Sequence, residues 1–158
     1  MSTREAIWLA LLDSARWERY YGVLAGRSQR LDTVVRSVLF LSALGSVTSL
    51  VAEMPDVVRV TCGLVVAGAL AVDFIAKPGQ RAATLVLIRD ECGRLRLALG
   101  DLLRRHPSMD DGQADAALVA LNSNLHHITA KDPTPWSDKV NEETTKAAFA
   151  EMESIYAS

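Results

Sequence analysis

SVLFLSALGSVTSLVA, residues 37–52, is a run of 16 residues without a charge. A second uncharged run, VTCGLVVAGALAV, covers residues 60–72 and reaches Ala76 if Asp73 is accepted within it. The short link between them carries three charged residues and is interrupted by Pro55, which breaks a helix. A membrane-spanning helix needs about 20 mostly apolar residues. Both runs are near the lower limit of that length, and their close succession predicts a two-helix transmembrane hairpin over residues 37–76.

A soluble protein offers a second interpretation of the same runs. Buried core helices give apolar stretches of about 10–14 residues, so the two runs are also compatible with a buried helical hairpin. A surface helix of a soluble protein carries a polar stripe at the helical period. Neither run has such a stripe, apart from small residues, and this favours the membrane.

Charge is distributed unevenly along the 158 residues. Residues 1–36 carry six Arg against four acids, and residues 77–105 carry seven Lys and Arg against three acids. Residues 106–158 have the opposite balance, with three Lys against nine acids. Basic residues thus flank the hairpin on the side of both termini, and the positive-inside rule places both termini in the cytoplasm. We expect an N-terminal cytoplasmic helix (1–36), the hairpin (37–76), a basic amphipathic cytoplasmic helix (77–105) and an acidic helical segment (106–158).

The segments outside the hairpin have helical periodicity. Ser2 and Glu5 predict a capping box, and no proline occurs before Pro55, so the first helix is expected to run almost directly into the first apolar run. The sequence Lys77-Pro78-Gly79 predicts a break, because a residue that precedes proline disfavours helix. After this break, apolar positions recur every three or four residues, namely Leu85, Ile88, Cys92, Leu95, Leu99 and Leu102.

Two further helices are expected after His106-Pro107. Ser108 and Asp111 predict a second capping box, and Ser137 or Asp138 is expected to cap the last helix. The first of these helices has a clear apolar stripe, made of Ala114, Leu118, Leu121, Leu125 and Ile128. No strand-like alternation of useful length occurs. The chain is therefore predicted to be all-α, with the transmembrane hairpin and about three to four amphipathic cytoplasmic helices.

Small residues occur on one face of each apolar run. The first run has Ser42, Gly45, Ser46 and Ser49, and the second has Gly63 and Ala67. Such residues let helices in lipid approach closely, and ordinary helix packing is one interpretation. The other is that the serine face lines a pore. Because one hairpin is too small to enclose a channel, a pore predicts a homo-oligomer.

Asp73 is the one carboxylate within the second run. A charge at the centre of a membrane helix costs about 2.5–3.5 kcal/mol on insertion scales. Lys77 follows four residues later, so a local ion pair at the membrane interface is one interpretation. A ring of Asp73 side chains at a pore mouth, which favours cations, is the other.

Arginines recur in the first helix and in the basic helix. Arg16, Arg19, Arg89 and Arg96 are candidate contacts for a ligand or partner, namely a nucleotide or oligonucleotide signal. The alternatives are a solvated or salt-bridged helix face and contact with anionic lipid headgroups. Duplex DNA is not expected as a partner.

Catalytic and metal-binding patterns do not emerge from the sequence. No serine or cysteine has a base at a recognisable spacing, and the adjacent acid pairs lie at helix starts, where they complement the helix dipole. Cys62 and Cys92 are too isolated for a disulfide framework or a metal site, and the three histidines lack metal-ligand spacing with them. We expect no enzyme activity, no metal and no cofactor.

ARWERYY (residues 15–21) and RSQR (27–30) precede the two closely spaced apolar runs, and a basic helix and a C-terminal helical segment follow. In this architecture and charge placement the chain resembles the SLATT family of two-transmembrane effectors, found in bacterial nucleotide-linked antiphage defence systems. The resemblance covers most of the chain.

The resemblance implies an effector that oligomerises in the bacterial inner membrane and damages it. It also implies a trigger from a nucleotide signal or from an operon-encoded sensor or nucleotidyltransferase. A non-conducting membrane scaffold or adaptor, and a soluble all-α interaction domain, are the competing functions. The acidic C-terminal segment is expected to pack against the basic helices and restrain them.

Overall fold

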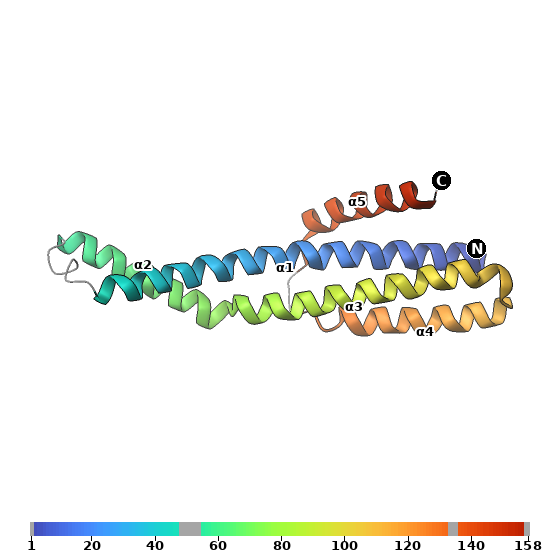
Figure 1. The fold of residues 1–158 in the computed structure, drawn as a ribbon, viewed down its shortest axis with the longest axis horizontal. Helices are drawn as coiled ribbons and strands as arrows, with labels where there is room; N and C mark the ends of the chain where they lie inside the picture. Colours follow the sequence, from blue (N-terminus) through green and yellow to red (C-terminus); the bar gives the residue numbers. More distant parts are fainter. Residues whose placement is uncertain (1, 48–54, 133–135, 157–158) are drawn as a thin grey trace. The chain divides into compact units, whose positions relative to one another are not determined.

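The computed structural model describes residues 2–47, 55–132 and 136–156, and every regular element in these ranges is helical. The elements are α1 (Thr3–Val47), α2 (Asp56–Ala76), α3 (Pro78–Arg105), a 3₁₀ turn η2 (His106–Ser108), α4 (Asp111–Thr129) and α5 (Asp138–Tyr156), as Figure 1 shows. The all-α prediction is confirmed for this part of the chain. As expected, the first helix continues without a break into the first apolar run, because no proline or capping signal interrupts it.

The chain divides into two compact units. Unit 1 comprises Met1–Leu24 and Thr84–Ser158, and unit 2 comprises Ala25–Ala83. Both boundaries fall inside helices, one in α1 and one in α3. Each unit therefore has its own packing but shares its long helices with the other.

Unit 1 is a bundle made from the first half of α1, most of α3, and α4 and α5, and its successive helices alternate in direction (Figure 1). All six apolar positions predicted for the basic helix are buried: Leu85, Ile88, Cys92, Leu95, Leu99 and Leu102. Large side chains of the other three helices are also buried, namely Ile7, Leu11, Tyr20 and Tyr21 of α1, Leu118 and Leu125 of α4, and Val140 and Met152 of α5. Burial of a large apolar side chain contributes roughly 1.5–3 kcal/mol, so this core stabilises unit 1.

Two helix starts were predicted from capping boxes, and one is confirmed. Ser2 N–H donates to Glu5 Oε2 at 2.9 Å, and Glu5 N–H donates to Ser2 Oγ at 3.3 Å. The box between Ser108 and Asp111 is wrong. Asp110 occupies the N-cap position of α4 without a side-chain cap, and Ser108 Oγ donates to the carbonyl of Arg105 instead. The 3₁₀ turn offers that carbonyl within reach, and a serine hydroxyl bonds such a local acceptor readily.

Unit 2 contains the second half of α1, α2 and the first residues of α3. Its buried side chains are few and include Val35, Pro78 and Ala82. Large apolar side chains of α2 are exposed, among them Leu64, Val65, Leu70, Phe74 and Ile75. Among the described helices, one stretch, Val60–Ser108, is long and apolar enough to cross a membrane by length and composition, and none of its apolar window is buried.

That stretch supports the membrane prediction at a coarse level only. It includes most of α2 and all of the second predicted span, residues 60–76. The first predicted span ends at residues 48–52, which lie outside the described residues. The paired transmembrane hairpin and the homo-oligomer therefore stay predictions.

The break predicted at Lys77-Pro78-Gly79 is confirmed. α2 ends at Ala76, and Lys77 adopts the left-handed conformation with φ 41° and ψ 54°, while its N–H donates to the carbonyl of Asp73. Lys77 is the one described non-glycine residue with positive φ. A left-handed cap closes a helix C-terminus, and Pro78 then begins α3 at a position where its missing N–H costs nothing.

Candidate functional site

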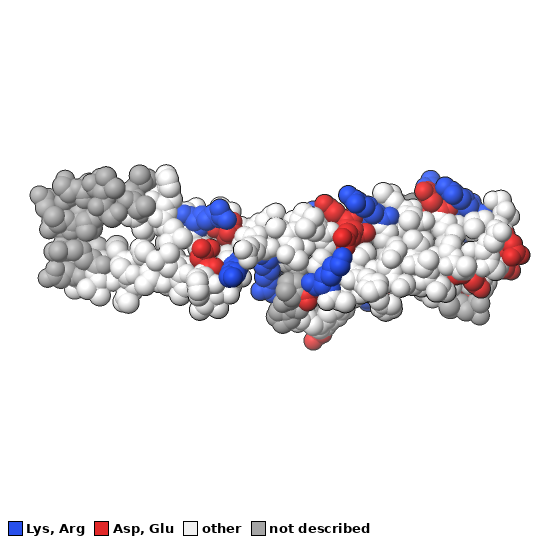
Figure 2. All heavy atoms as spheres, turned by 90° about the horizontal axis from the view of Figure 1, so that it is seen from below, with Lys and Arg blue, Asp and Glu red and all other residues white. Residues whose placement is uncertain are grey.

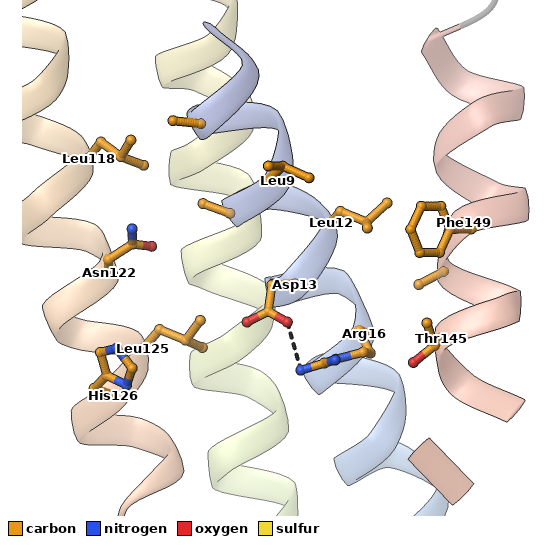
Figure 3. Close-up of a pocket in the computed structure, with 13 residues that line it drawn as sticks. Leu9, Leu12, Asp13, Arg16, Leu118, Asn122, Leu125, His126, Thr145 and Phe149 are labelled. Atoms are coloured by element: carbon orange, nitrogen blue, oxygen red, sulfur yellow. Dashed lines mark ion pairs between the residues drawn. The ribbon is translucent and has the colours of Figure 1, made fainter. Parts of the chain in front are cut away.

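A groove in unit 1 runs between α1, α4 and α5 and has a volume of about 590 Å³. Figure 3 shows α1 between the other two helices, with Leu12 and Phe149 facing each other at one edge. Small residues form part of the lining, namely Ala6, Ala10 and Ala148. Ligand sites in proteins typically have volumes of about 300–1,000 Å³ and mostly apolar walls with a few polar groups, and this groove fits that description.

Polar groups of the groove gather around Asp13 and Arg16. Arg16 Nη2 lies 2.7 Å from Asp13 Oδ1 (Figure 3), and its guanidinium carbon lies 5.1 Å from the centre of the Trp17 ring. Asp13 Oδ2 accepts a hydrogen bond from Trp17 Nε1 at 3.2 Å. Arg16 Nε is buried and has no hydrogen-bond partner among the described residues. Asn122 and His126 line the same groove from α4.

A second cluster joins three helices of unit 1 through one carboxylate. Glu151 of α5 accepts a hydrogen bond from Arg19 Nε at 3.1 Å and lies 3.4 Å from Arg96 Nη1 of α3. Arg96 Nε also lies 2.9 Å from Glu18 Oε2. The hydrogen bond from Arg19 and the positive charges of both arginines hold the pKa of Glu151 below its usual range, against the opposing effect of burial. The carboxylate is therefore charged near neutral pH.

Aromatic rings lie next to this cluster. Trp17 and Tyr21 stack with ring centres 5.6 Å apart, and Tyr20 stacks on Trp136 at 5.4 Å. The Tyr20 hydroxyl accepts a hydrogen bond from Ser137 N–H at 3.1 Å. Burial raises the pKa of Tyr21 above its ordinary value, so its hydroxyl stays neutral. The rings fix residues next to the start of α5 against α1.

The four arginines proposed as ligand or partner contacts thus lie in different surroundings. Arg19 and Arg96 are brought together on Glu151, whereas Arg16 lines the groove. Arg89 is half-exposed, with its Nε 4.0 Å from a carboxylate oxygen of its neighbour along the chain. Sequence reasoning missed Glu151 because its partners are 55 and 132 residues away. Only the net negative charge of residues 106–158 pointed towards such a contact.

The residues proposed for a pore or for helix packing belong to unit 2. Ser42 Oγ donates to the carbonyl of Val38 at 2.7 Å, a bond that satisfies the hydroxyl within its own helix. Gly63 and Ala67 are exposed, and a Cβ built on Gly63 would contact nothing within 4 Å. The described contacts of unit 2 thus leave the small face of α2 open. Of the other predicted residues of the first run, the surroundings of Gly45 and Ser46, and Ser49 as a whole, lie outside what the structure describes.

Asp73 lies at a hollow of about 320 Å³ within unit 2. The same hollow is lined by Asp32, Arg36, Lys77 and Gly79. Arg36 Nε pairs with Asp32 Oδ2 at 2.8 Å. Of the ion pairs between residues that the structure describes, none joins the side chains of Asp73 and Lys77, although the N–H of Lys77 donates to the carbonyl of Asp73. The local ion pair, one of the two interpretations of Asp73, is therefore not formed in this structure.

The distribution of charge on unit 2 separates this hollow from the uncharged middle part of α2. Figure 2 shows Lys, Arg, Asp and Glu of unit 2 gathered at one end of a stretch that is otherwise free of them on this face. Residues 60–72 carry no charge. Such a charged border beside an apolar helix is typical of a membrane interface.

Among the described residues, neither the cysteines nor any cluster of metal-ligating side chains forms a recognisable reactive or metal-binding site. Cys62 is exposed and Cys92 is buried, and the two are free thiols. Burial raises the pKa of Cys92 to about 12, so its thiolate is scarce at neutral pH. In the described ranges, no group of three or more His, Cys, Asp and Glu is placed to hold a metal ion.

Comparison with known proteins identifies no relative of this chain. No protein-family model matches the chain, and neither the curated proteins nor the solved structures give a significant match. The fold and the site define an all-helical chain that combines a helical bundle with an exposed apolar helix.

Proposed function

We propose that the chain is a membrane effector of a bacterial antiphage defence system, which oligomerises in the inner membrane and opens a pore or disrupts the bilayer when triggered. The observation that carries the proposal is the exposure of α2. None of the residues in its most apolar stretch is buried. Exposed apolar surface of this extent marks a protein or membrane contact. An apolar helix in the core of a soluble protein would be covered instead.

Charge placement supports a cytoplasmic position of both termini in this proposal. Arg36 and Lys77 lie at the charged hollow next to α2, and seven Lys and Arg occur in residues 77–105. Basic residues next to a span remain on the cytoplasmic side. In the inserted state Asp73 is close to this border, where a carboxylate costs less than at the bilayer centre.

The trigger in this proposal acts on the cluster around Glu151. Arg19 and Arg96 both contact this carboxylate, so α5 covers two of the arginines proposed for a nucleotide signal or a sensor protein. A phosphate-bearing ligand or an acidic partner would compete for the same guanidinium groups. Binding that favours the state with α5 displaced would shift the chain towards that state.

Membrane insertion is tested by placing a charge on α2. We would express the full chain in bacteria and measure its share in the membrane fraction and the uptake of propidium, a membrane-impermeant dye. Leu64→Arg is expected to lower both, because a central arginine costs about 2.5–3.5 kcal/mol on insertion scales. Leu64 is exposed, so the change disturbs no buried packing. Val23→Arg, at an exposed valine of unit 1, is the matched control.

Two further variants test pore formation and its trigger. Asp73→Leu, at an equal amount of membrane-bound chain, is expected to lower dye uptake if the carboxylate is at a pore mouth. Glu151→Arg repels Arg19 and Arg96 and is expected to raise dye uptake without a signal, whereas Glu143→Arg on the same helix is not. Stable insertion without dye uptake in all of these variants would favour a non-conducting scaffold. Recovery of the wild type in the supernatant without detergent would overturn the proposal.

A further inference from the structure

The outer face of α3 in unit 1 carries exposed leucines. Leu87 and Leu97 are each 65% exposed. Leu97 lies two residues from the buried Leu95 and two from the buried Leu99, so at 3.6 residues per turn it is on the opposite side of the helix. Arg94 follows Leu87 by seven residues and shares its face. Arg105 likewise follows Leu97 by eight residues, and both arginines are exposed.

Charges on this outer face are only partly matched. Asp101 forms an ion pair with Arg104, and Asp90 lies 4.0 Å from Arg89. The other two arginines of the face, at positions 94 and 105, have no ion-pair partner among the described residues. The face is thus an apolar ridge with unpaired positive charge. We call it the α3 ridge and define it by Leu87, Arg94, Leu97 and Arg105.

The edges of the groove between α1, α4 and α5 carry unpaired negative charge, in contrast to the positive charge of the α3 ridge. Asp115 lies three and seven residues before the groove residues Leu118 and Asn122, so it shares their face of α4. Glu153 follows Phe149 by four residues and lies at the α5 edge. Both carboxylates are exposed, and neither has an ion-pair partner among the described residues. The groove therefore has a mostly apolar lining that also holds the Asp13–Arg16 pair, with two unpaired carboxylates at its edges.

We propose that the groove of one chain receives the α3 ridge of a second copy of this chain. The two surfaces are complementary in polarity, because leucines meet an apolar floor, and in charge, because unpaired arginines meet unpaired carboxylates. Complementary charges of this kind select the partner and set its register. The inference rests on the self-association contained in the proposed function and names the surfaces that carry it.

The two surfaces are different parts of the chain, so the contact is head-to-tail. The groove is lined by described residues of α1, α4 and α5 and by none of α3, and the α3 ridge points away from the buried side of α3. A head-to-tail contact leaves a free groove on one copy and a free ridge on the other. Repetition of such a contact gives a closed ring when the rotation closes.

Charge reversal on each surface tests the contact without disturbing the core. The ridge variant is Arg94→Glu with Arg105→Glu, and the groove variant is Asp115→Arg with Glu153→Arg. We would measure the mass of the full chain in mild detergent by light scattering over a range of concentrations. Each variant alone is expected to associate at least tenfold more weakly than the wild type. Glu143→Arg, at an exposed carboxylate on another face of α5, is the control and is expected to leave the mass unchanged.

Mixing the two variants distinguishes this contact from general loss of association. In the mixture, every reversed ridge can meet a reversed groove and every unchanged ridge an unchanged groove, so the two variants are expected to associate with each other as strongly as wild-type chains do. A wild type that stays a single chain, or variants with wild-type mass, would overturn the inference. So would a mixture that does not recover. Dye uptake is measured separately, so membrane damage that persists in both variants would leave the proposed function standing while the inference fails.

Discussion

Removal of the Glu151 charge is expected to loosen α5. Glu151→Gln keeps the shape of the side chain but removes the ion pairs with Arg19 and Arg96. The side chains of Arg19, Arg96 and Glu151 are 39%, 29% and 31% exposed, so solvent screens the cluster in part. Exposed ion pairs contribute about 0.2–1 kcal/mol each, and the two pairs together contribute about 1 kcal/mol. Since 1.4 kcal/mol is a factor of ten, opening of α5 should become roughly fivefold more frequent.

Hydrogen exchange of the α5 amides measures this opening. Glu143→Gln is the matched control, because Glu143 is exposed and lies on the same helix. The opening of α5 should also depend on pH. The pKa of Glu151 is lowered from 4.5 in the folded chain, so its contribution is complete above about pH 4.5 and is lost as the pH falls through the lowered value. Equal α5 exchange in the wild type and Glu151→Gln at neutral pH would refute the assignment of the cluster.

Three further changes test the bundle of unit 1. Leu99→Ala should lower the free energy of unfolding by about 2–5 kcal/mol, because Leu99 is fully buried, whereas the exposed Leu97→Ala should lower it by less than about 0.5 kcal/mol; denaturant titration in detergent compares the two. Ser2→Ala should cost about 1 kcal/mol at the start of α1 through loss of the capping box, which faster exchange of the first-turn amides would reveal. Cys92 should resist maleimide at about pH 8 until the bundle unfolds, because it is buried and its pKa is raised to about 12; rapid labelling of Cys92 itself in the folded chain, as distinct from the exposed Cys62, would contradict this.

Local patterns predicted much of the fold. The six buried positions of α3 follow the helical period, and that period alone identifies the buried face of the helix. The break at Lys77-Pro78 and the cap at Ser2 depend on neighbours within four residues, and both were found. The cap expected at Ser108 was wrong because α4 begins later, with Asp110 rather than Ser108 at the N-cap position.

Contacts between residues that are far apart in the sequence could not be predicted from such patterns. Nothing near Glu151 in sequence identifies Arg19 and Arg96 as its partners, because the contact depends on how α5 packs against α1 and α3. The groove is likewise made by three helices from distant parts of the chain. Arg16 was a candidate for ligand contact, but its place in the groove required the folded bundle. The role of Asp73 depends on the surrounding membrane, which no pattern of neighbouring residues describes.

The ring cluster gives the chain an internal optical reporter. Trp17 and Trp136 have ring centres 5.6 Å apart, and Trp136 precedes the first residue of α5 by two positions. Indole rings at that separation couple in their electronic transitions, so the near-ultraviolet circular dichroism depends on whether both rings remain in place. Detachment of the segment that leads into α5 would therefore change a spectrum of the unlabelled protein, and the state of this helix can be followed without an added dye.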